Sequence, residues 1–295
     1  MQKTPLVTVI CLCYNHEVFV VDSLNSVINQ NYKNIELIIV DDYSPDNSKK
    51  VIEKWLEEYP NIQFISNDVN IGNTKSFNNA LKMANGEYII DLAADDILMP
   101  DCIALQIESF EKSTYKNLGV VYGNAELITE ESKFNSYYFA VDTFKKVIQK
   151  RITGDIYLSV ISGGDSICSV SAMIKKSVFD KLIGFDETLL YEDLDFWIRA
   201  SRIYEFDFID SILVKKRKVS NSLGSQFYQK FKAKSKKINY STFLIINKAK
   251  ALNKTREENK ALLKRVHSEM TNAYKTYNFI LFIKYIPLEL KLRFS

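Results

Sequence analysis

Apolar segments of strand length alternate with amphipathic helical segments along the first 90 residues of the chain. The strand-like segments are residues 7–13, 36–40, 63–65 and 88–90. The helical segments, where apolar residues recur every three or four positions, are residues 20–28, 51–56 and 75–84. Ser44 and Pro45 predict the beginning of the second helix, as its N-cap and its first helical residue. Strands that alternate with helices in this way predict βαβ crossovers and a largely parallel sheet.

The remainder of the chain is less regular. The elements expected there are helices over residues 100–111 and from Tyr191, and strands over residues 119–122 and 169–174. Residues 126–165 show little periodicity, and we interpret them as a loop-rich insertion beside the functional site. From about Ser225 to the end the pattern is helical, basic and aromatic.

Charge is distributed unevenly along the chain. Residues 215–295 contain 20 Lys and Arg against 4 Glu, a net charge of +16, although the whole chain carries only +3. Residues 1–214 therefore carry 19 basic and 32 acidic groups, a net charge of −13. A basic extension on an acidic body indicates that the extension is attracted to an anionic surface, while the body carries the chemistry.

The composition is that of a folded protein in a reducing compartment. Hydrophobic residues make up 46% of the 295 residues, enough for a core of ordinary size. The four cysteines include no CxxC pair, and with only two histidines they offer no Cys/His metal-site spacing. The beginning of the chain lacks the pattern of a signal peptide, and no run of about 18 apolar residues is free of charges. We expect a cytoplasmic protein without a membrane-spanning helix.

Three pairs of acidic residues follow predicted strands or begin a predicted helix. They are Asp41-Asp42, Asp95-Asp96 and Glu192-Asp193. Ligands of an open parallel sheet bind at the carboxyl ends of its strands. A single aspartate in such a place is most often a turn former or a helix N-cap. Three pairs at one edge of the sheet instead indicate a functional site.

Such carboxylates suit the transfer of a sugar from a nucleotide diphosphate. The leaving diphosphate gains charge, which a divalent cation held by carboxylates such as Asp95 and Asp96 stabilises. The acceptor hydroxyl is a poor nucleophile and needs a carboxylate to take its proton. Asp193 is the candidate base, and we expect the positive end of its helix to keep it ionised at neutral pH.

Glycine-rich phosphate-binding motifs do not occur in the sequence. Cys13-Tyr14-Asn15-His16 stands where a GxGxxG motif would follow the first strand, and no GxxxxGK[ST] motif is present. This argues against a dinucleotide-dependent oxidoreductase and against a P-loop enzyme.

An ordered series of motifs closely resembles the family 2 glycosyltransferases, which have the GT-A fold. The matching segments are residues 8–15, 26–32, 36–42, 70–72, 85–89, 95–96, 184–187 and 192–199. Each motif alone is weak, but their order is highly specific. The resemblance implies a GT-A domain over residues 1–224, in which residues 1–100 bind the nucleotide sugar and residues 101–224 bind the acceptor. Residues 225–295 would then be a basic amphipathic helical extension.

The resemblance also implies roles on the donor side. The position of Asp42 contacts the nucleotide base, usually uracil, and the positions of Leu12, Cys13 and Tyr14 shape the same pocket. Lys75 is a candidate phosphate contact, although a solvated helix face is the commoner role for one lysine.

Around the reacting centre, the resemblance makes Asp193 the base of an inverting single displacement, with Glu192 beside it near the acceptor. Phe196 and Trp197 are expected to support their helix. Asp95 and Asp96 match the end of the metal-binding motif, so Asp95 also borders the donor, and Mn²⁺ or Mg²⁺ is the implied cofactor.

Two positions depart from the family pattern. Ala93 stands where many members have the first acid of Asp-x-Asp, and Val219 stands where many have a histidine. Two metal ligands are therefore missing. An inactive member that acts as a partner of another transferase is the alternative that these losses suggest, whereas the retention of Asp42, Asp95, Asp96 and Asp193 favours an enzyme.

The expected function is transfer from a UDP-sugar to a hydroxyl of a glycan or lipid-linked acceptor, as in the assembly of a bacterial surface polysaccharide. Residues 126–165, including the segment 162–165, are expected to select the acceptor. A nucleic-acid-binding protein would suit the basic extension, but no nucleic-acid-binding motif is present. A nucleotidyltransferase would carry a glycine-rich, basic loop after the first strand.

The basic extension predicts attachment to the cytoplasmic face of a membrane. Its residues 227–232 interleave aromatic with basic side chains, and its residues 277–286 are apolar but too short and interrupted to span a bilayer. The alternative is that Ile280, Leu281 and Ile283 pack on the catalytic domain or form the interface of a homo-oligomer.

Overall fold

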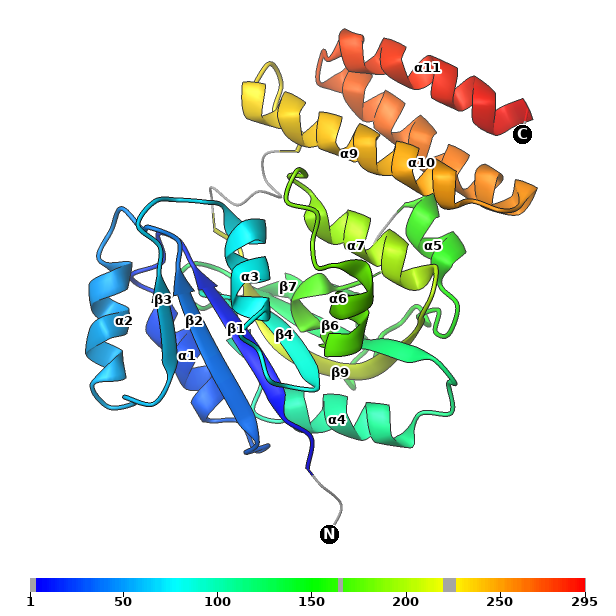
Figure 1. The fold of residues 1–295 in the computed structure, drawn as a ribbon. Helices are drawn as coiled ribbons and strands as arrows, with labels where there is room; N and C mark the ends of the chain where they lie inside the picture. Colours follow the sequence, from blue (N-terminus) through cyan, green and yellow to red (C-terminus); the bar gives the residue numbers. More distant parts are fainter. Residues whose placement is uncertain (1–3, 164–166, 220–226, 295) are drawn as a thin grey trace.

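The structure is a computed structural model that describes residues 4–163, 167–219 and 227–294 (Figure 1). Within these residues, one sheet of nine strands runs through the molecule, in the order β3-β2-β1-β4-β8-β6-β9-β5, with β7 paired to β6. The strands are β1 (Val7–Cys13), β2 (Ile35–Asp41), β3 (Gln63–Ser66), β4 (Tyr88–Ala93), β5 (Ile97–Leu98), β6 (Leu118–Ile128), β7 (Phe134–Tyr137), β8 (Met173–Lys175) and β9 (Glu205–Arg217).

The strands of the first half are parallel, as predicted. β1 lies between β2 and β4, with Leu12 opposite Val40 on one side and Ala93 on the other, so the three strands end at the same edge. All seven residues of β1 are buried, because helices cover both faces of the sheet. β8 runs antiparallel to β4 and β6, and β6 and β9 are parallel. This is the mostly parallel, helix-flanked sheet of the GT-A fold.

Helices cover both faces of this sheet. The helices are α1 (Val20–Ile28), α2 (Ser48–Leu56), α3 (Asn73–Leu81), α4 (Cys102–Lys112), α5 (Tyr157–Ser162), α6 (Lys176–Leu182) and α7 (Glu192–Ser201). In Figure 1, α3, α6 and α7 lie in front of the sheet and α1 lies behind it. The thiol of Cys11 contacts the hydroxyl of Ser23 on α1, which places alternate side chains of β1 against the rear helices.

The predicted beginning of α2 is wrong by three residues. The helix begins at Ser48, with Asn47 at its N-cap, and not at Pro45. Ser44 instead closes the turn after β2: its amide donates to Oδ2 of Asp41 (3.1 Å), and its hydroxyl accepts from the amide of Asn15 (3.0 Å). The serine therefore joins the ends of β1 and β2, and its hydroxyl is not available to cap a helix.

The region read as a loop-rich insertion contains more regular structure than predicted. β6 continues to Ile128 and pairs with β7, and α5 follows at residues 157–162. The strand predicted over residues 169–174 is also partly wrong. A short 3-10 helix occupies Ser169–Ser171, because the amide of Ser171 bonds to the carbonyl of Cys168 (3.0 Å), and β8 begins only at Met173.

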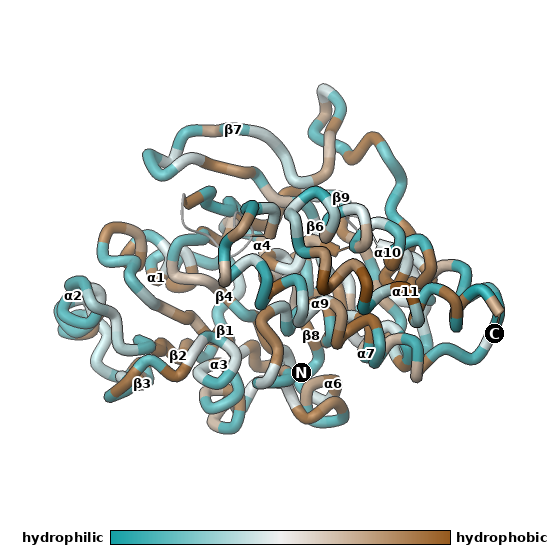
Figure 2. The backbone as a smooth tube through the Cα atoms, turned by 90° about the horizontal axis from the view of Figure 1, so that it is seen from above, coloured by the Kyte–Doolittle hydropathy of each residue, from teal (hydrophilic) through white to brown (hydrophobic). Residues whose placement is uncertain are grey.

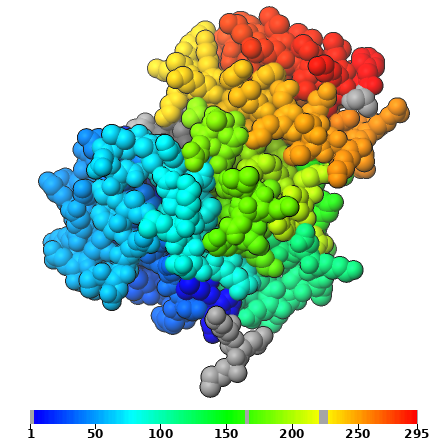
Figure 3. All heavy atoms as spheres, in the orientation of Figure 1, coloured from blue at the N-terminus to red at the C-terminus, as the bar shows by residue number. Residues whose placement is uncertain are grey.

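The extension is helical, as predicted, and its described residues, 227–294, form three helices. They are α9 (Ala233–Leu252), α10 (Arg256–Lys275) and α11 (Phe279–Phe294). The predicted boundary at residue 224 lies outside the described residues. Figures 1 and 3 show these helices as a layer at the end of the molecule opposite the N-terminus, against α5 and α7. Viewed from above, α2 and β3 lie at one end of the molecule and α11 at the other (Figure 2).

Charged side chains fasten this layer to the catalytic domain. Lys248 of α9 forms ion pairs with Asp186, which precedes α7 (2.9 Å), and with Asp195, in the first turn of α7. The buried guanidinium of Arg265, from α10, donates to the carbonyls of Val160 and Ile161 at the end of α5 (2.9 and 3.2 Å). None of the helices in the described residues is both long and apolar enough to cross a membrane.

Candidate active site

Asp42, at the end of β2, anchors the loop that leads into α3. Its amide donates to the carbonyl of Cys13 (2.9 Å). Its Oδ1 accepts from Nδ2 of Asn67 (2.8 Å) and the amide of Ile71 (2.9 Å), and its Oδ2 accepts from the amide of Gly72 (2.8 Å). A carboxylate accepts about four hydrogen bonds. Asp42 therefore keeps about one acceptor position for a ligand.

The other predicted donor-side residues differ in exposure. Leu12 and Cys13 are buried, and their carbonyls accept from the amides of Ala94 and Asp42 (2.9 Å each), so the backbone of both residues joins the ends of the neighbouring strands. The side chain of Tyr14 is 47% exposed at the same edge, where its ring can lie against a base. Lys75 is exposed in the first turn of α3.

Asp95 and Asp96 form the turn between β4 and β5, and Arg217 at the end of β9 holds it. The amide of Arg217 donates to Oδ1 of Asp96 (2.8 Å), and its Nε donates to the carbonyl of Asp95 (3.1 Å). The guanidinium lies over the ring of Phe19, 4.5 Å from the ring centroid. Burial, and then repulsion by Asp95, raises the pKa of Asp96. The two carboxylates are therefore fixed close together.

Asp193 lies in the first turn of α7, where Ser169 orients it. The hydroxyl of Ser169 donates to Oδ2 of Asp193 (3.1 Å) and accepts from Nε1 of Trp197 (3.0 Å). Burial raises the pKa of Asp193 and outweighs the hydrogen bonds that lower it. The cost of burying the carboxylate thus exceeds the benefit that we expected from the helix dipole. A raised pKa brings a carboxylate closer to the range of a general base.

Glu192 links α7 to α3 beside this carboxylate. Its Oε1 accepts from Nδ2 of Asn73 at 3.4 Å. Burial, and then repulsion by Asp193, raises the pKa of Glu192. Phe196 and Trp197 are buried in the same helix, where Phe196 stacks on Phe179 of α6, so both support α7 as expected.

The structure brings Asp96, Glu192 and Asp193 into one cluster and adds two residues that sequence reasoning missed. Asp91 of β4 has a pKa raised to about 7 by burial and by the charges of Glu192, Asp193 and Asp96. Lys216 of β9 lies close enough to lower the pKa of both Asp96 and Asp193. Carboxyl groups that raise one another's pKa in this way favour the binding of a further cation.

His16 lies beside the aspartate turn. Its Nδ1 is buried without a hydrogen-bond partner and lies 3.9 Å from Oδ1 of Asp95. Its amide donates to Oγ of Ser48 (2.9 Å), and its ring meets Phe19 edge to face, with the ring centroids 6.2 Å apart. His16 is therefore positioned by residues at the beginnings of α1 and α2.

The residues present are compatible with a divalent cation beside Asp95 and Asp96. Two carboxylates and an orphaned imidazole nitrogen are the donor types that Mn²⁺ accepts. Within the ranges that the structure describes, no three His, Cys, Asp or Glu side chains converge on a preformed metal site. Mg²⁺-type sites commonly use one or two carboxylates and complete their shell with substrate phosphates. A cation here would accordingly be shared with the donor.

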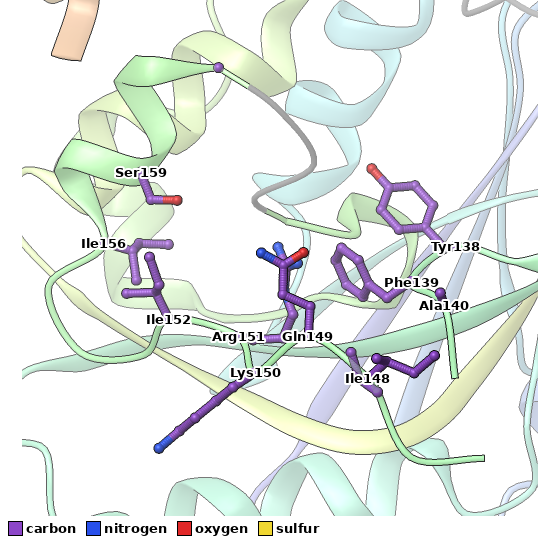
Figure 4. A pocket seen from close by; sticks show the side chains of 12 residues that line it. Tyr138, Phe139, Ala140, Ile148, Gln149, Lys150, Arg151, Ile152, Ile156 and Ser159 are labelled. Atoms are coloured by element: carbon purple, nitrogen blue, oxygen red, sulfur yellow. The ribbon is translucent and has the colours of Figure 1, made fainter. Parts of the chain in front are cut away.

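A cavity of about 500 Å³ among the described residues is lined by the segment 138–152 and by residues in and beside α5 (Figure 4), and none of the acidic residues above lines it. Tyr138, Phe139, Gln149, Arg151 and Ile156 are among its lining side chains. The hydroxyl of Tyr138 donates to the carbonyl of Ile167 (3.2 Å), two residues before Ser169. Gly163 also lines this cavity, whereas Gly164 and Asp165 of the predicted acceptor-selecting segment lie outside the described residues.

Of the four residues that sequence reasoning missed, only Asp91 carries a signal in the sequence. It is a charged residue inside the otherwise apolar run of β4, and a carboxylate in a strand covered on both faces usually has a partner or a ligand. Ser169, Lys216 and His16 carry no such signal, because their roles come from contacts with residues distant in sequence.

A mostly parallel sheet with this acidic edge defines a glycosyltransferase of the GT-A type. The model of glycosyl transferase family 2 matches residues 8–183, and the chain belongs to that family. An uncharacterized glycosyltransferase of Methanocaldococcus jannaschii is 32% identical over 222 residues, which cover 72% of this chain and 71% of the relative.

Solved structures share the fold at low sequence identity. S. aureus TarS (residues 1–349) in complex with UDP-GlcNAc has a TM-score of 0.71 and 19% identity, over 97% of this chain and 81% of that chain. The mannosyltransferase PcManGT from Pyrobaculum calidifontis, in complex with GDP-Man and Mn²⁺, has a TM-score of 0.61 and 15% identity, over 99% of this chain and 85% of that chain.

Proposed function

We propose that this glycosyltransferase moves a sugar from a UDP-sugar to a hydroxyl of a glycan or lipid-linked acceptor, with inversion at the anomeric carbon. The observation that carries the proposal is the carboxylate of Asp193, whose Oδ2 accepts from the hydroxyl of Ser169 and whose Oδ1 accepts from the amide of Leu194, while Lys216 lowers the pKa of both Asp193 and Asp96. A base and a phosphate-binding side placed opposite each other are what a single displacement needs. The polysaccharide type of acceptor follows from the family resemblance.

In the proposed step, Asp193 accepts the proton of the acceptor hydroxyl as its oxygen attacks the anomeric carbon. The bond from that carbon to the diphosphate oxygen breaks, and UDP leaves with the electron pair. Ser169 keeps one oxygen of Asp193 occupied, so the carboxylate presents a defined face to the acceptor. Because the base and leaving group lie on opposite sides of the sugar, the configuration inverts.

The ends of β1 and β2 support recognition of the nucleotide. Asp42 has about one acceptor position left, which suits the single N–H group of uracil, and the ring of Tyr14 is exposed beside it. TarS is solved with UDP-GlcNAc and PcManGT with GDP-Man, so the fold itself accepts either base. The choice of UDP rests on Asp42 and on the family resemblance.

On the diphosphate side, Asp95 and Asp96 would hold Mn²⁺ or Mg²⁺. When bound, such a cation neutralises the charge that develops on the leaving diphosphate. The ammonium of Lys216 supplies a fixed positive charge at the same place, and Arg217 keeps both aspartates in position. Lys75, exposed near the loop that Asp42 anchors, is a further candidate phosphate contact.

The acceptor would enter from the side of α5, where the cavity of Figure 4 lies. Tyr138 in the cavity wall bonds to the carbonyl of Ile167, two residues before Ser169, and Ser169 bonds to the proposed base, Asp193. Polar and aromatic side chains together suit a glycan, whose rings have both hydroxyl groups and apolar faces.

The outward face of α11 supports attachment to the cytoplasmic face of a membrane. Of the three residues that the packing alternative named, Leu281 is buried, whereas Ile280 and Ile283 are exposed. The inward side of the helix consists of Leu281, Tyr285, Leu288 and Leu292. The opposite side is also apolar and exposed, formed by Phe279, Ile280, Ile283, Ile286, Leu290 and Phe294. Basic residues on the same helix are Lys284, Lys291 and Arg293. A helix of this kind lies in the interface of an anionic bilayer.

Calorimetric titration tests the donor proposal. The full chain with Mn²⁺ should bind UDP more tightly than GDP. Asp42→Ala should weaken UDP binding, whereas Asp68→Ala, at an exposed acid of the same loop, should not. Equal or weaker binding of UDP than of GDP contradicts the proposed donor.

A further inference from the structure

We propose that His16 is a metal ligand of this enzyme and that its Nδ1 takes the place of ligands missing at Ala93 and Val219. The inference rests on the proposed metal dependence and names the side chain that completes the site. It concerns a residue that the sequence places in the turn after β1, away from the acidic motif.

The position of the nitrogen carries the inference. Nδ1 of His16 lies 3.9 Å from Oδ1 of Asp95, too far for a hydrogen bond but within the span of two ligands on one cation. With metal–ligand bonds of about 2.1 Å each, a cation fits between two such atoms. The same nitrogen is buried without any hydrogen-bond partner, which is costly for a polar atom unless a ligand compensates it.

The surroundings keep this imidazole in place. The amide of His16 donates to Oγ of Ser48, and its carbonyl accepts from the amides of Phe19 and Val20 at the start of α1. The ring packs on Phe19, which in turn lies under the guanidinium of Arg217. One cluster therefore positions both His16 and the aspartate turn, so a cation can recruit the nitrogen without a rearrangement of the backbone.

Because family ligands are missing, a cation at this site needs a further protein ligand. Position 93 has no acid and position 219 has no histidine. The turn therefore offers a cation only the carboxylate oxygens of Asp95 and Asp96. Oδ1 of Asp96 already accepts from the amide of Arg217, which leaves fewer lone pairs for a cation. A nitrogen ligand from His16 adds a third protein ligand to the two carboxylates and favours Mn²⁺ over Mg²⁺.

Pulsed electron paramagnetic resonance of Mn²⁺ tests the assignment without reference to activity. In the complex of the full chain with Mn²⁺ and UDP, we expect modulation of the electron spin echo by a directly bound ¹⁴N nucleus. His16→Ala should abolish the modulation and weaken Mn²⁺ binding about tenfold or more, the lower limit for the loss of partners in metal sites. His267→Ala, at the second histidine of the chain, should change neither, because that ring bonds to Glu289 on α11.

The outcomes separate this inference from the proposed function. If Mn²⁺ binds with UDP but shows no ¹⁴N modulation, or keeps it in His16→Ala, His16 is not a ligand, and the metal-dependent mechanism stands. If no Mn²⁺ binds in the presence of UDP, both the metal dependence and the ligand assignment are wrong. Absence of Mn²⁺ binding or of ¹⁴N modulation is read from the unmodified chain, so these two results do not depend on the folding of a variant. Assignment of the modulation to His16 requires the comparison of His16→Ala with His267→Ala.

Discussion

The hydroxyl of Ser169 donates a 3.1 Å hydrogen bond to Oδ2 of Asp193, on a carboxylate whose pKa burial raises. This bond lowers the pKa, because it stabilises the ionised form of the carboxyl group. Trp197 donates to the same hydroxyl, which fixes the direction in which Ser169 points its proton. Ser169 therefore controls both the orientation and the ionisation of the proposed base.

Ser169→Ala should move the acidic limb of the pH–rate profile to higher pH. Removing the hydrogen bond raises the pKa of Asp193 further, so a larger fraction of the enzyme carries a protonated base at a given acidic pH. The profile of kcat/KM against pH, measured for both proteins, checks this. An unshifted acidic limb, or a shift toward lower pH, would show that Ser169 does not act on the base.

Asp193→Asn should lower transfer by about a hundredfold or more, which is the usual contribution of a positioned base. The amide has a similar shape but cannot take the proton. UDP binding, measured by calorimetry, should stay within about twofold of the unmodified enzyme. Asp180→Asn, at an exposed acid of α6 that pairs with Lys176, is the matched control and should keep full activity. Substantial transfer by Asp193→Asn would assign the base to another group.

Arg217→Lys should destabilise the protein by about 3 kcal/mol, because a buried charge would lose its partners. The guanidinium donates to the carbonyls of Asp95, Thr129 and Glu130 and to Oγ of Ser132, and an ammonium group cannot satisfy all four. Chemical denaturation measures the change. Arg293→Lys, on the surface of α11, should change the free energy of unfolding by no more than about 0.5 kcal/mol. Equal effects of the two substitutions would contradict the role of Arg217.

The outward face of α11 makes a prediction about membranes. The full chain should sediment with anionic vesicles of phosphatidylglycerol and phosphatidylcholine, and salt should weaken the binding. Ile280 and Ile283 are 75% and 62% exposed, and their joint replacement by Asp should abolish sedimentation while the fold persists. Ile183→Asp is the control, because Ile183, the C-cap residue after α6, is 89% exposed and its φ of 60° tolerates Asp.

Two other results would overturn this membrane assignment. Binding that is equal on neutral and anionic vesicles would remove the role of the basic residues. A concentration-dependent dimer that the same double substitution dissociates, with no vesicle binding, would make this face an interface between copies of the chain.

The sequence predicts the sheet well where a run of apolar residues is compatible with only one kind of element. β1 is apolar at every position but Thr8, and such a run in a βαβ pattern fits only a strand covered on both faces. Because parallel strands end at one edge, the proximity of the β1, β2 and β4 ends also followed from the sequence. The motifs then identified the family, whereas the roles of Asp193 and Asp96 stay predictions.

Contacts between distant segments could not be predicted in the same way. Ser169 looked like part of a strand, yet a 3-10 turn directs its hydroxyl to α7. Serine is a common N-cap residue, but the hydroxyl of Ser44 instead accepts a hydrogen bond from the amide of Asn15, just after β1. The proposed roles of His16 and Lys216 depend on their proximity to Asp95 and Asp96, which lie more than 75 residues away from either in the sequence. Local propensity does not include these competing partners.

The most direct test of the proposed reaction is nucleotide release from a panel of UDP-, GDP- and CMP-activated sugars, with and without EDTA. The unmodified enzyme should release UDP from at least one UDP-sugar in the presence of Mn²⁺, and Asp193→Asn should release it about a hundredfold more slowly. Loss of the activity in EDTA is also expected. Consumption of a GDP- or CMP-sugar in preference to every UDP-sugar, or equal rates for Asp193→Asn, would contradict the proposed mechanism.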